Sequence, residues 1–132
     1  MSSPAQTAPP TTKMLWAGRI TTAIPAFLLL LSGVMKLLML APVMQAFAHF
    51  GYPESVIRPI GLLEIACTVV YLFPRTAVLG AILMTGYLGG ATATNVRIGD
   101  PAFILPALAG VLVWGGLYFR DERIRALIPL RK

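Results

Sequence analysis

Apolar side chains form four long runs in this 132-residue chain. The runs cover about residues 20–40, 57–73, 77–96 and 102–119, and short stretches containing proline, glycine or charged residues separate them. A transmembrane helix needs about 20 mostly apolar residues, within a range of about 17–25. The pattern therefore predicts an all-α fold, in which residues 13–132 form a bundle of four transmembrane helices.

Two segments outside these runs have their own patterns. Residues 1–12 are rich in Ser, Thr, Pro and Ala and lack charged side chains before the first lysine, so we expect a disordered N-terminal tail. Within residues 41–55, apolar side chains recur at helical spacing at Val43, Met44, Phe47 and Phe50. This spacing predicts a short amphipathic interfacial helix between the first two membrane helices, ended by Gly51 and Pro53.

The composition supports a membrane protein. Only 12% of the residues are charged, against about 25% in soluble domains, and the mean hydropathy is +0.77. The net charge of +6 does not indicate a nucleic-acid partner, because the basic residues lie at the ends of apolar runs. With one cysteine and one histidine, the chain has too few ligands for a zinc centre, so no metal site is predicted.

The basic residues also predict an orientation. Two of those near the ends of the runs, Arg58 and Arg97, fall on one side of the bundle. The others fall on the opposite side: Lys13, Arg19, Arg75, Arg120, Arg123, Arg125, Arg131 and Lys132. Because cytoplasmic segments carry the excess of Lys and Arg, we expect both termini to be cytoplasmic.

Glu64 is the most unusual residue of the apolar runs. A charged side chain at the centre of a membrane helix costs about 2.5–3.5 kcal/mol on insertion scales. Glu64 must therefore be protonated, be paired, or face a wet cavity. Lys36 of the first run is expected at a similar depth in the outer half of the bundle, so we predict that the two side chains meet.

Polar residues of three runs are predicted to converge around this pair. Ser32 and Lys36 share one face of the first helix, Glu64 and Thr68 share a face of the second, and Thr92 and Asn95 belong to a stripe on the third. Arg97 and His49 are expected at the mouth of the resulting pocket. The predicted ligand-binding set is Lys36, Glu64, Thr68, Thr92, Asn95 and Arg97.

The residues alone leave two interpretations open. The Lys36–Glu64 pair either fixes which helices are neighbours, or holds a small polar head group such as a quinone carbonyl while an apolar tail lies in lipid. The Gly86-x-x-x-Gly90 spacing permits close helix packing, either at the centre of the bundle or across a homo-oligomer.

Several short motifs are shared with one known family. They are Gly33 to Lys36, Gly51-Tyr52-Pro53, Gly61-Leu62-Leu63-Glu64, Phe73 to Ala77, Gly86 to Thr94 with Arg97, Trp114 to Tyr118, and Arg120 to Pro129. On these residues the chain resembles the DoxX-like family of small bacterial four-helix membrane proteins. The resemblance implies a multi-pass protein of the bacterial plasma (inner) membrane, related to membrane subunits of quinone and sulfur-compound redox systems and of oxidative-stress complexes. It implies no accepted catalytic residues.

The first functional hypothesis is therefore an accessory membrane subunit that binds a quinone or lipid and a membrane or redox partner protein. The alternative is a small proton-coupled transporter, since four-span drug exporters also carry one essential membrane Glu. The second-span location of Glu64 and the strong charge bias count against it. An independent enzyme is disfavoured, because the chain has no second acid near Glu64 and no cofactor motif.

Overall fold

A computed structural model of the protein describes residues 12–128 and residue 130. Apart from Thr12, the predicted disordered tail lies outside these residues. The long helices are α1 (Thr12–Leu38), α3 (Ile57–Leu72), α4 (Ala77–Arg97) and α5 (Ile104–Arg120). The shorter elements are α2 (Ala41–Phe50), α6 (Glu122–Leu127) and the 3-10 turns η1 (Glu54–Val56), η2 (Pro74–Thr76) and η3 (Pro101–Phe103). The predicted all-α fold with four helices suited to crossing a membrane is confirmed.

Local sequence explains most helix boundaries. Pro42 lies in the first turn of α2, where its missing N–H costs nothing, and Gly51 ends that helix in a left-handed conformation at φ +83°. The turn between α3 and α4 contains Pro74, and Thr76 closes it by donating from its hydroxyl to the Val70 carbonyl at 2.7 Å. Within the described residues helix α1 extends from the apolar run back to Thr12, because residues 12–19 contain no proline and several good helix formers.

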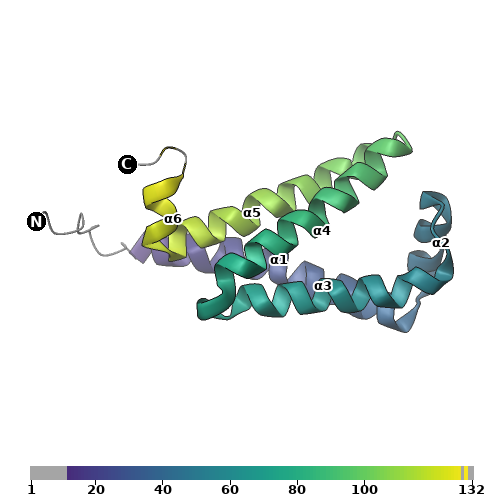
Figure 1. Ribbon diagram of the computed structural model, residues 1–132, viewed down its shortest axis with the longest axis horizontal. Helices are drawn as coiled ribbons and strands as arrows, with labels where there is room; N and C mark the ends of the chain where they lie inside the picture. The colour runs from purple at the N-terminus through teal and green to yellow at the C-terminus, as the bar shows by residue number, and fades with distance from the viewer. Residues whose placement is uncertain (1–11, 129, 131–132) are drawn as a thin grey trace, which may run out of the picture.

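The four long helices form two pairs that separate toward one end. Helix α1 packs against α3 and α5, and α4 packs against the same two helices, so the order around the bundle is α1, α3, α4, α5. In Figure 1 the α4 and α5 ribbons lie beside α1 and α3 near α6 and diverge from them toward α2. The start of α1 and the helix α6 therefore lie at the closed end, and α2 lies at the open end.

The hydrophobic core is concentrated in the closed half of the bundle. It contains Leu29, Cys67, Tyr71, Ala77, Ala81, Met84, Leu88, Val113, Leu117 and Ile124. Tyr71 is completely buried and donates its hydroxyl hydrogen to the Val113 carbonyl at 2.7 Å. The guanidinium of Arg120 lies 4.8 Å from the centre of the Tyr71 ring. One tyrosine thus joins α3 to α5 through its hydroxyl and its ring face.

Four glycines set the close approaches between helices. A Cβ atom on Gly61 would lie 2.9 Å from the Gly33 carbonyl oxygen, and one on Gly116 would lie 2.5 Å from the Thr22 hydroxyl. A Cβ atom on Gly80 would collide with the backbone of Tyr71. These contacts bring α1 to α3, α1 to α5, and α3 to α4.

The predicted packing motif of the third membrane helix behaves differently. A Cβ atom on Gly86 or Gly90 would meet no atom within 4 Å. Of the two packings predicted for this spacing, the one at the centre of the bundle is therefore wrong, and packing across a homo-oligomer stays a prediction. The reason is that α4 diverges from α1 and α3 over this stretch, so its contacts are made one or two turns earlier, at Gly80 (Figure 1).

Asp121 caps the start of helix α6 at the closed end. The Asp121 carboxylate accepts a hydrogen bond from the Arg123 amide at 2.9 Å and forms an ion pair with its guanidinium at 3.2 Å. Partial burial raises the pKa of the Asp121 carboxyl, but the hydrogen bonds and charge of Arg123 outweigh this effect and hold the pKa below its ordinary value. The charged carboxylate is therefore the form that favours the helical start of α6.

This pKa shift predicts the acid response of α6. A carboxyl group with a lowered pKa in the folded state stabilises it at pH values above its ordinary pKa, and that stabilisation is lost as the pH falls through the lowered value. We expect amide protection in residues 122–127 to be constant between pH 7 and 5 and to fall below about pH 4. Hydrogen exchange, corrected for intrinsic rates, measures this. The pH dependence should disappear in Asp121→Asn, and its persistence there would contradict the assignment.

Candidate ligand-binding site

A cavity of about 850 Å³ lies between the two separating helix pairs. Its walls come from α1, α3, α4 and α5, and at the open end the aromatic side chains Phe47, Phe50 and Tyr52 complete it. Those three rings contact one another with centroids 5.9–6.4 Å apart. The volume falls within the range of about 300–1,000 Å³ that is usual for small-molecule sites. Most of the lining is apolar, and the polar side chains are grouped.

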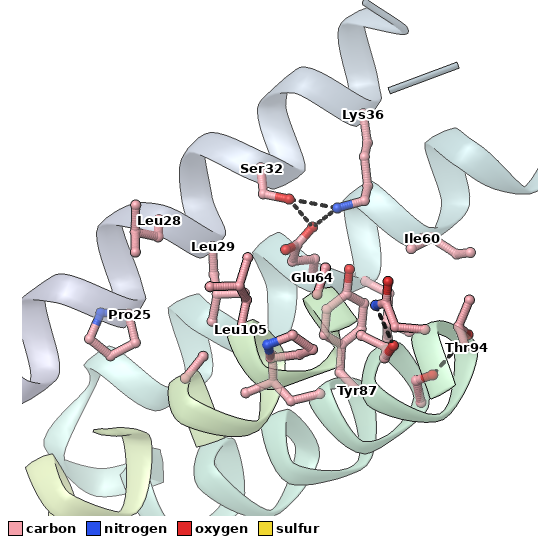
Figure 2. Close-up of a pocket in the computed structure, with 18 of the residues that line it drawn as sticks. Pro25, Leu28, Leu29, Ser32, Lys36, Ile60, Glu64, Tyr87, Thr94 and Leu105 are labelled. Atoms are coloured by element: carbon pink, nitrogen blue, oxygen red, sulfur yellow. Dashed lines mark hydrogen bonds and ion pairs between the residues drawn. The ribbon is translucent and has the colours of Figure 1, made fainter. Parts of the chain in front are cut away.

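The first polar group joins α1 to α3. Lys36 Nζ lies 2.7 Å from Glu64 Oε2, and it also donates to Ser32 Oγ at 2.6 Å. The Ser32 hydroxyl donates in turn to Glu64 Oε2 at 3.3 Å. Figure 2 shows the three side chains converging at the cavity wall. The predicted meeting of Lys36 with Glu64 is confirmed, and Glu64 is 2% exposed.

The glycine contact between α1 and α3 explains why these side chains reach each other. Ser32 and Lys36 are separated by one helical turn and so lie on the same face of α1. Gly61 lies one turn before Glu64 and receives the Lys36 stem, because a Cβ atom there would be 2.7 Å from Lys36 Cβ. A larger residue at position 61 would push α1 outward and lengthen the ion pair.

The ion pair leaves hydrogen-bonding capacity directed at the cavity. The hydrogen bonds from Ser32 and Lys36 to the Glu64 side chain both end on Oε2, and the Tyr87 hydroxyl lies close to the same carboxylate. The Lys36 ammonium has three hydrogens and makes two hydrogen bonds within the described chain. The Tyr87 ring lies next to Glu64 in Figure 2. The group therefore presents a donor and an acceptor side by side.

A second polar group lies nearer the open end. Asn95 is 9% exposed, lines the cavity and donates through its amide nitrogen to the Ala91 carbonyl at 2.9 Å. Its side-chain oxygen has no hydrogen-bond partner among residues 12–128 and 130. The hydroxyls of Tyr52 and Thr94 lie 2.8 Å apart and join the segment after α2 to α4.

Three of the six predicted binding residues do not line this cavity. Thr68 is buried and its hydroxyl donates to the Glu64 carbonyl at 2.8 Å, which satisfies it within α3. Thr92 lines a separate hollow between α4 and α5. The side of α4 that faces the cavity contains Tyr87, Ala91 and Asn95, and each residue along a helix is rotated by about 100° from the one before it, so Thr92 points away from Ala91. Arg97 donates to the Phe50 carbonyl and so attaches the end of α2 to α4.

Two cavity residues were missed in the sequence, Tyr87 and Thr94. In the sequence Tyr87 resembles any aromatic residue of an apolar run. It nevertheless lies two turns before Asn95 on the same face of α4. Tyr87 could have been predicted by following the helix face of Asn95 toward the start of the third apolar run. Thr94 carried no such signal, because its role depends on Tyr52 from another part of the chain.

Comparison with known proteins gives one result. A model of the DoxX-like family matches residues 20–116. The chain belongs to the DoxX-like family. The matched part of this DoxX-like protein runs from α1 to α5 and includes Lys36, Glu64, Tyr87 and Asn95. Together with the four apolar helices, the family marks it as a membrane protein. No curated protein and no solved structure matches the chain.

Proposed function

We propose that this DoxX-like protein is an accessory membrane subunit that binds a quinone, or another lipid with an uncharged oxygen-bearing head, in the cavity. The observation that carries the proposal is the Lys36–Glu64 pair at the wall of an 850 Å³, mostly apolar cavity. A quinone carbonyl can accept from the third Lys36 hydrogen, and a hydroxyl can donate to Glu64. Most small-molecule sites combine an apolar lining with a few convergent polar groups in this way.

A purely structural role for the ion pair explains less. Helices α1 and α3 are already held together by the Gly33 and Gly61 contact. Buried ion pairs add little stability, because the cost of removing two charges from water is close to the gain from their attraction. A pair that only joined these helices would also have no need of a cavity beside it.

The proposal extends to orientation and partners. With the excess of basic residues on the cytoplasmic side, the α6 end would face the cytoplasm and the cavity would lie in the outer half of the bilayer. A bound quinone there would be available to a redox partner in the bacterial inner membrane. The hydrogen-bond donor and acceptor of the Lys36–Glu64 pair support a role in which this subunit holds the ligand for its partner.

Native mass spectrometry of gently extracted protein tests the proposal. We expect the wild type to carry a lipid-sized or quinone-sized adduct and Glu64→Gln to lose it, because the amide cannot pair with the Lys36 ammonium. Glu122→Gln is the matched control, since Glu122 is exposed on α6 at the closed end. An adduct retained by Glu64→Gln, or no adduct on any of the three proteins, would contradict a ligand site at this pair.

A further inference from the structure

The cavity-facing side of α4 has no side chain at two positions. Gly86 and Gly90 are one turn apart, both line the cavity, and a Cβ atom on either would meet nothing within 4 Å. Glycine weakens a helix relative to alanine. At Gly33, Gly61, Gly80 and Gly116 a neighbouring helix explains why no side chain is present, but no helix approaches Gly86 or Gly90. The missing side chains leave volume inside the cavity instead.

This part of the cavity is continuous with the lipid-facing surface. Gly86 and Gly90 are exposed as well as cavity-lining. Leu63 of the neighbouring helix α3 also lines the cavity and is 53% exposed. Leu28 of α1 and Leu105 of α5 line the cavity and are exposed in the same way on the opposite side. A molecule in the bilayer can therefore reach the cavity sideways, between α3 and α4 or between α1 and α5, without crossing the aromatic group at the open end.

An independent observation on the same wall points to a ligand. Asn95 is more than nine-tenths buried, lies about one turn beyond Gly90 and Ala91, and has no hydrogen-bond partner for its side-chain oxygen among the described residues. The Asn95 oxygen is open to the cavity, because the buried side-chain oxygen without a partner among the described residues is Thr22 Oγ1. A hydrogen-bond donor inside the cavity can therefore reach the Asn95 oxygen. Water or the head of a ligand in the cavity supplies such a donor.

The charged side chains that line the cavity indicate which head group a ligand can carry. Among the described lining residues the charged side chains are Lys36 and Glu64, which form an ion pair with no net charge. An anionic head would be repelled by Glu64 and would compete with it for Lys36. An uncharged head that both donates and accepts hydrogen bonds disturbs the pair least.

We infer that the Gly86 and Gly90 face of α4 holds the hydrocarbon chain of a lipid that has one chain and an uncharged oxygen-bearing head, and that enters the cavity sideways from the bilayer. The inference rests on the proposed function. It adds a position for the hydrocarbon chain of the lipid, beside Gly86 and Gly90, to the position of the head at Lys36 and Glu64. An alkyl quinone and a monoacylglycerol share this chemistry. A larger side chain at position 86 should therefore weaken binding of the hydrocarbon chain and leave binding of the head group unchanged.

A pair of leucine variants tests the inference. Gly86→Leu places a side chain in the cavity, whereas Gly89→Leu places the same side chain on the other face of α4, where a Cβ atom also meets nothing within 4 Å. Binding of three probes is titrated by native mass spectrometry: decyl-ubiquinone, the same quinone head without its chain, and monoolein. We expect Gly86→Leu to weaken a chain-bearing probe that binds the wild type by about tenfold or more, because several buried CH₂ groups lose their site.

The matched results make the outcome decisive. Gly89→Leu should bind the same chain-bearing probe within about twofold of the wild type, and the chainless quinone should bind Gly86→Leu and the wild type equally. The chain-bearing probe that binds identifies the head as quinone or glyceride. If Gly86→Leu proves too unstable to purify, Gly90→Leu makes the same test. Equal losses in Gly86→Leu and Gly89→Leu, or an equal loss of the chainless quinone, would overturn the inference.

The two proposals fail in different ways. If Glu64→Gln fails to bind the chain-bearing probe but Gly86→Leu binds it as the wild type does, the hydrocarbon chain does not lie at Gly86. The further inference is then wrong, and the proposed head-group site at Lys36 and Glu64 is retained. If neither substitution changes binding of any probe, the cavity does not hold the ligand and both proposals are wrong.

Discussion

Replacing Lys36 by Met is expected to destabilise the folded protein by about 3–5 kcal/mol, because it leaves a buried carboxylate without its cation. Glu64 is 2% exposed, and its nearest cationic atom is Lys36 Nζ at 2.7 Å. The Ser32 hydroxyl, at 3.3 Å, is too weak a donor to replace an ammonium. Equilibrium unfolding in mixed detergent micelles, followed by circular dichroism, measures the change.

The double substitution Lys36→Met with Glu64→Gln separates stability from binding. Removing both charges should recover most of the stability lost in Lys36→Met, because no unpaired charge remains. Ligand binding should stay lost, since both polar contacts are gone. Lys13→Met is the control, because Lys13 is exposed near the start of α1. A double variant as unstable as Lys36→Met would show that the ion pair itself holds the fold.

Gly80→Ala is expected to be the most damaging single-methyl change in the bundle. The added Cβ atom would collide with backbone atoms of Tyr71, which cannot rotate away as a side chain can. Overpacking of a core costs about 1–3 kcal/mol and sometimes more, and we expect the upper part of this range. Separation of α3 from α4 would also strain the hydrogen bond from Tyr71 to the Val113 carbonyl. The same unfolding assay measures the loss.

Gly89→Ala is the matched substitution on the same helix. Its Cβ atom would meet nothing within 4 Å, so we expect it to be neutral or to stabilise the helix by about 0.5–1 kcal/mol. Equal stabilities for the two alanine variants would mean that α3 and α4 do not touch at Gly80. The comparison therefore tests the helix arrangement independently of any ligand.

The sequence predicted the helices and the ion pair because both depend on short-range patterns. Apolar runs of sufficient length specify membrane helices, and a charge within such a run requires a partner at similar depth. Lys36 and Glu64 are the residues that meet this requirement, and they are found together. The depth of a residue follows from its distance to the helix end, which the sequence gives directly.

The cavity itself could not be predicted, because it depends on angles between helices. Gly80 and Gly86 look alike in the sequence, yet a neighbouring backbone touches the first and open space surrounds the second. The position of Thr92 depends on the same angles. Thr92 and Asn95 are three residues apart and were placed on one stripe, but the dividing line between the cavity and the outer hollow passes between them.

The glycines that bring the helices close together are separate from the residues that line the cavity. Gly33, Gly61, Gly80 and Gly116 fix the distances between helices, and none of them lines the cavity. We expect lining positions such as Leu63, Gly86 and Leu105 to accept other side chains without a change in those distances. The shape of the cavity could then change by substitutions at its wall while the bundle stays the same, which would make the bundle a usable scaffold for designing lipid receptors.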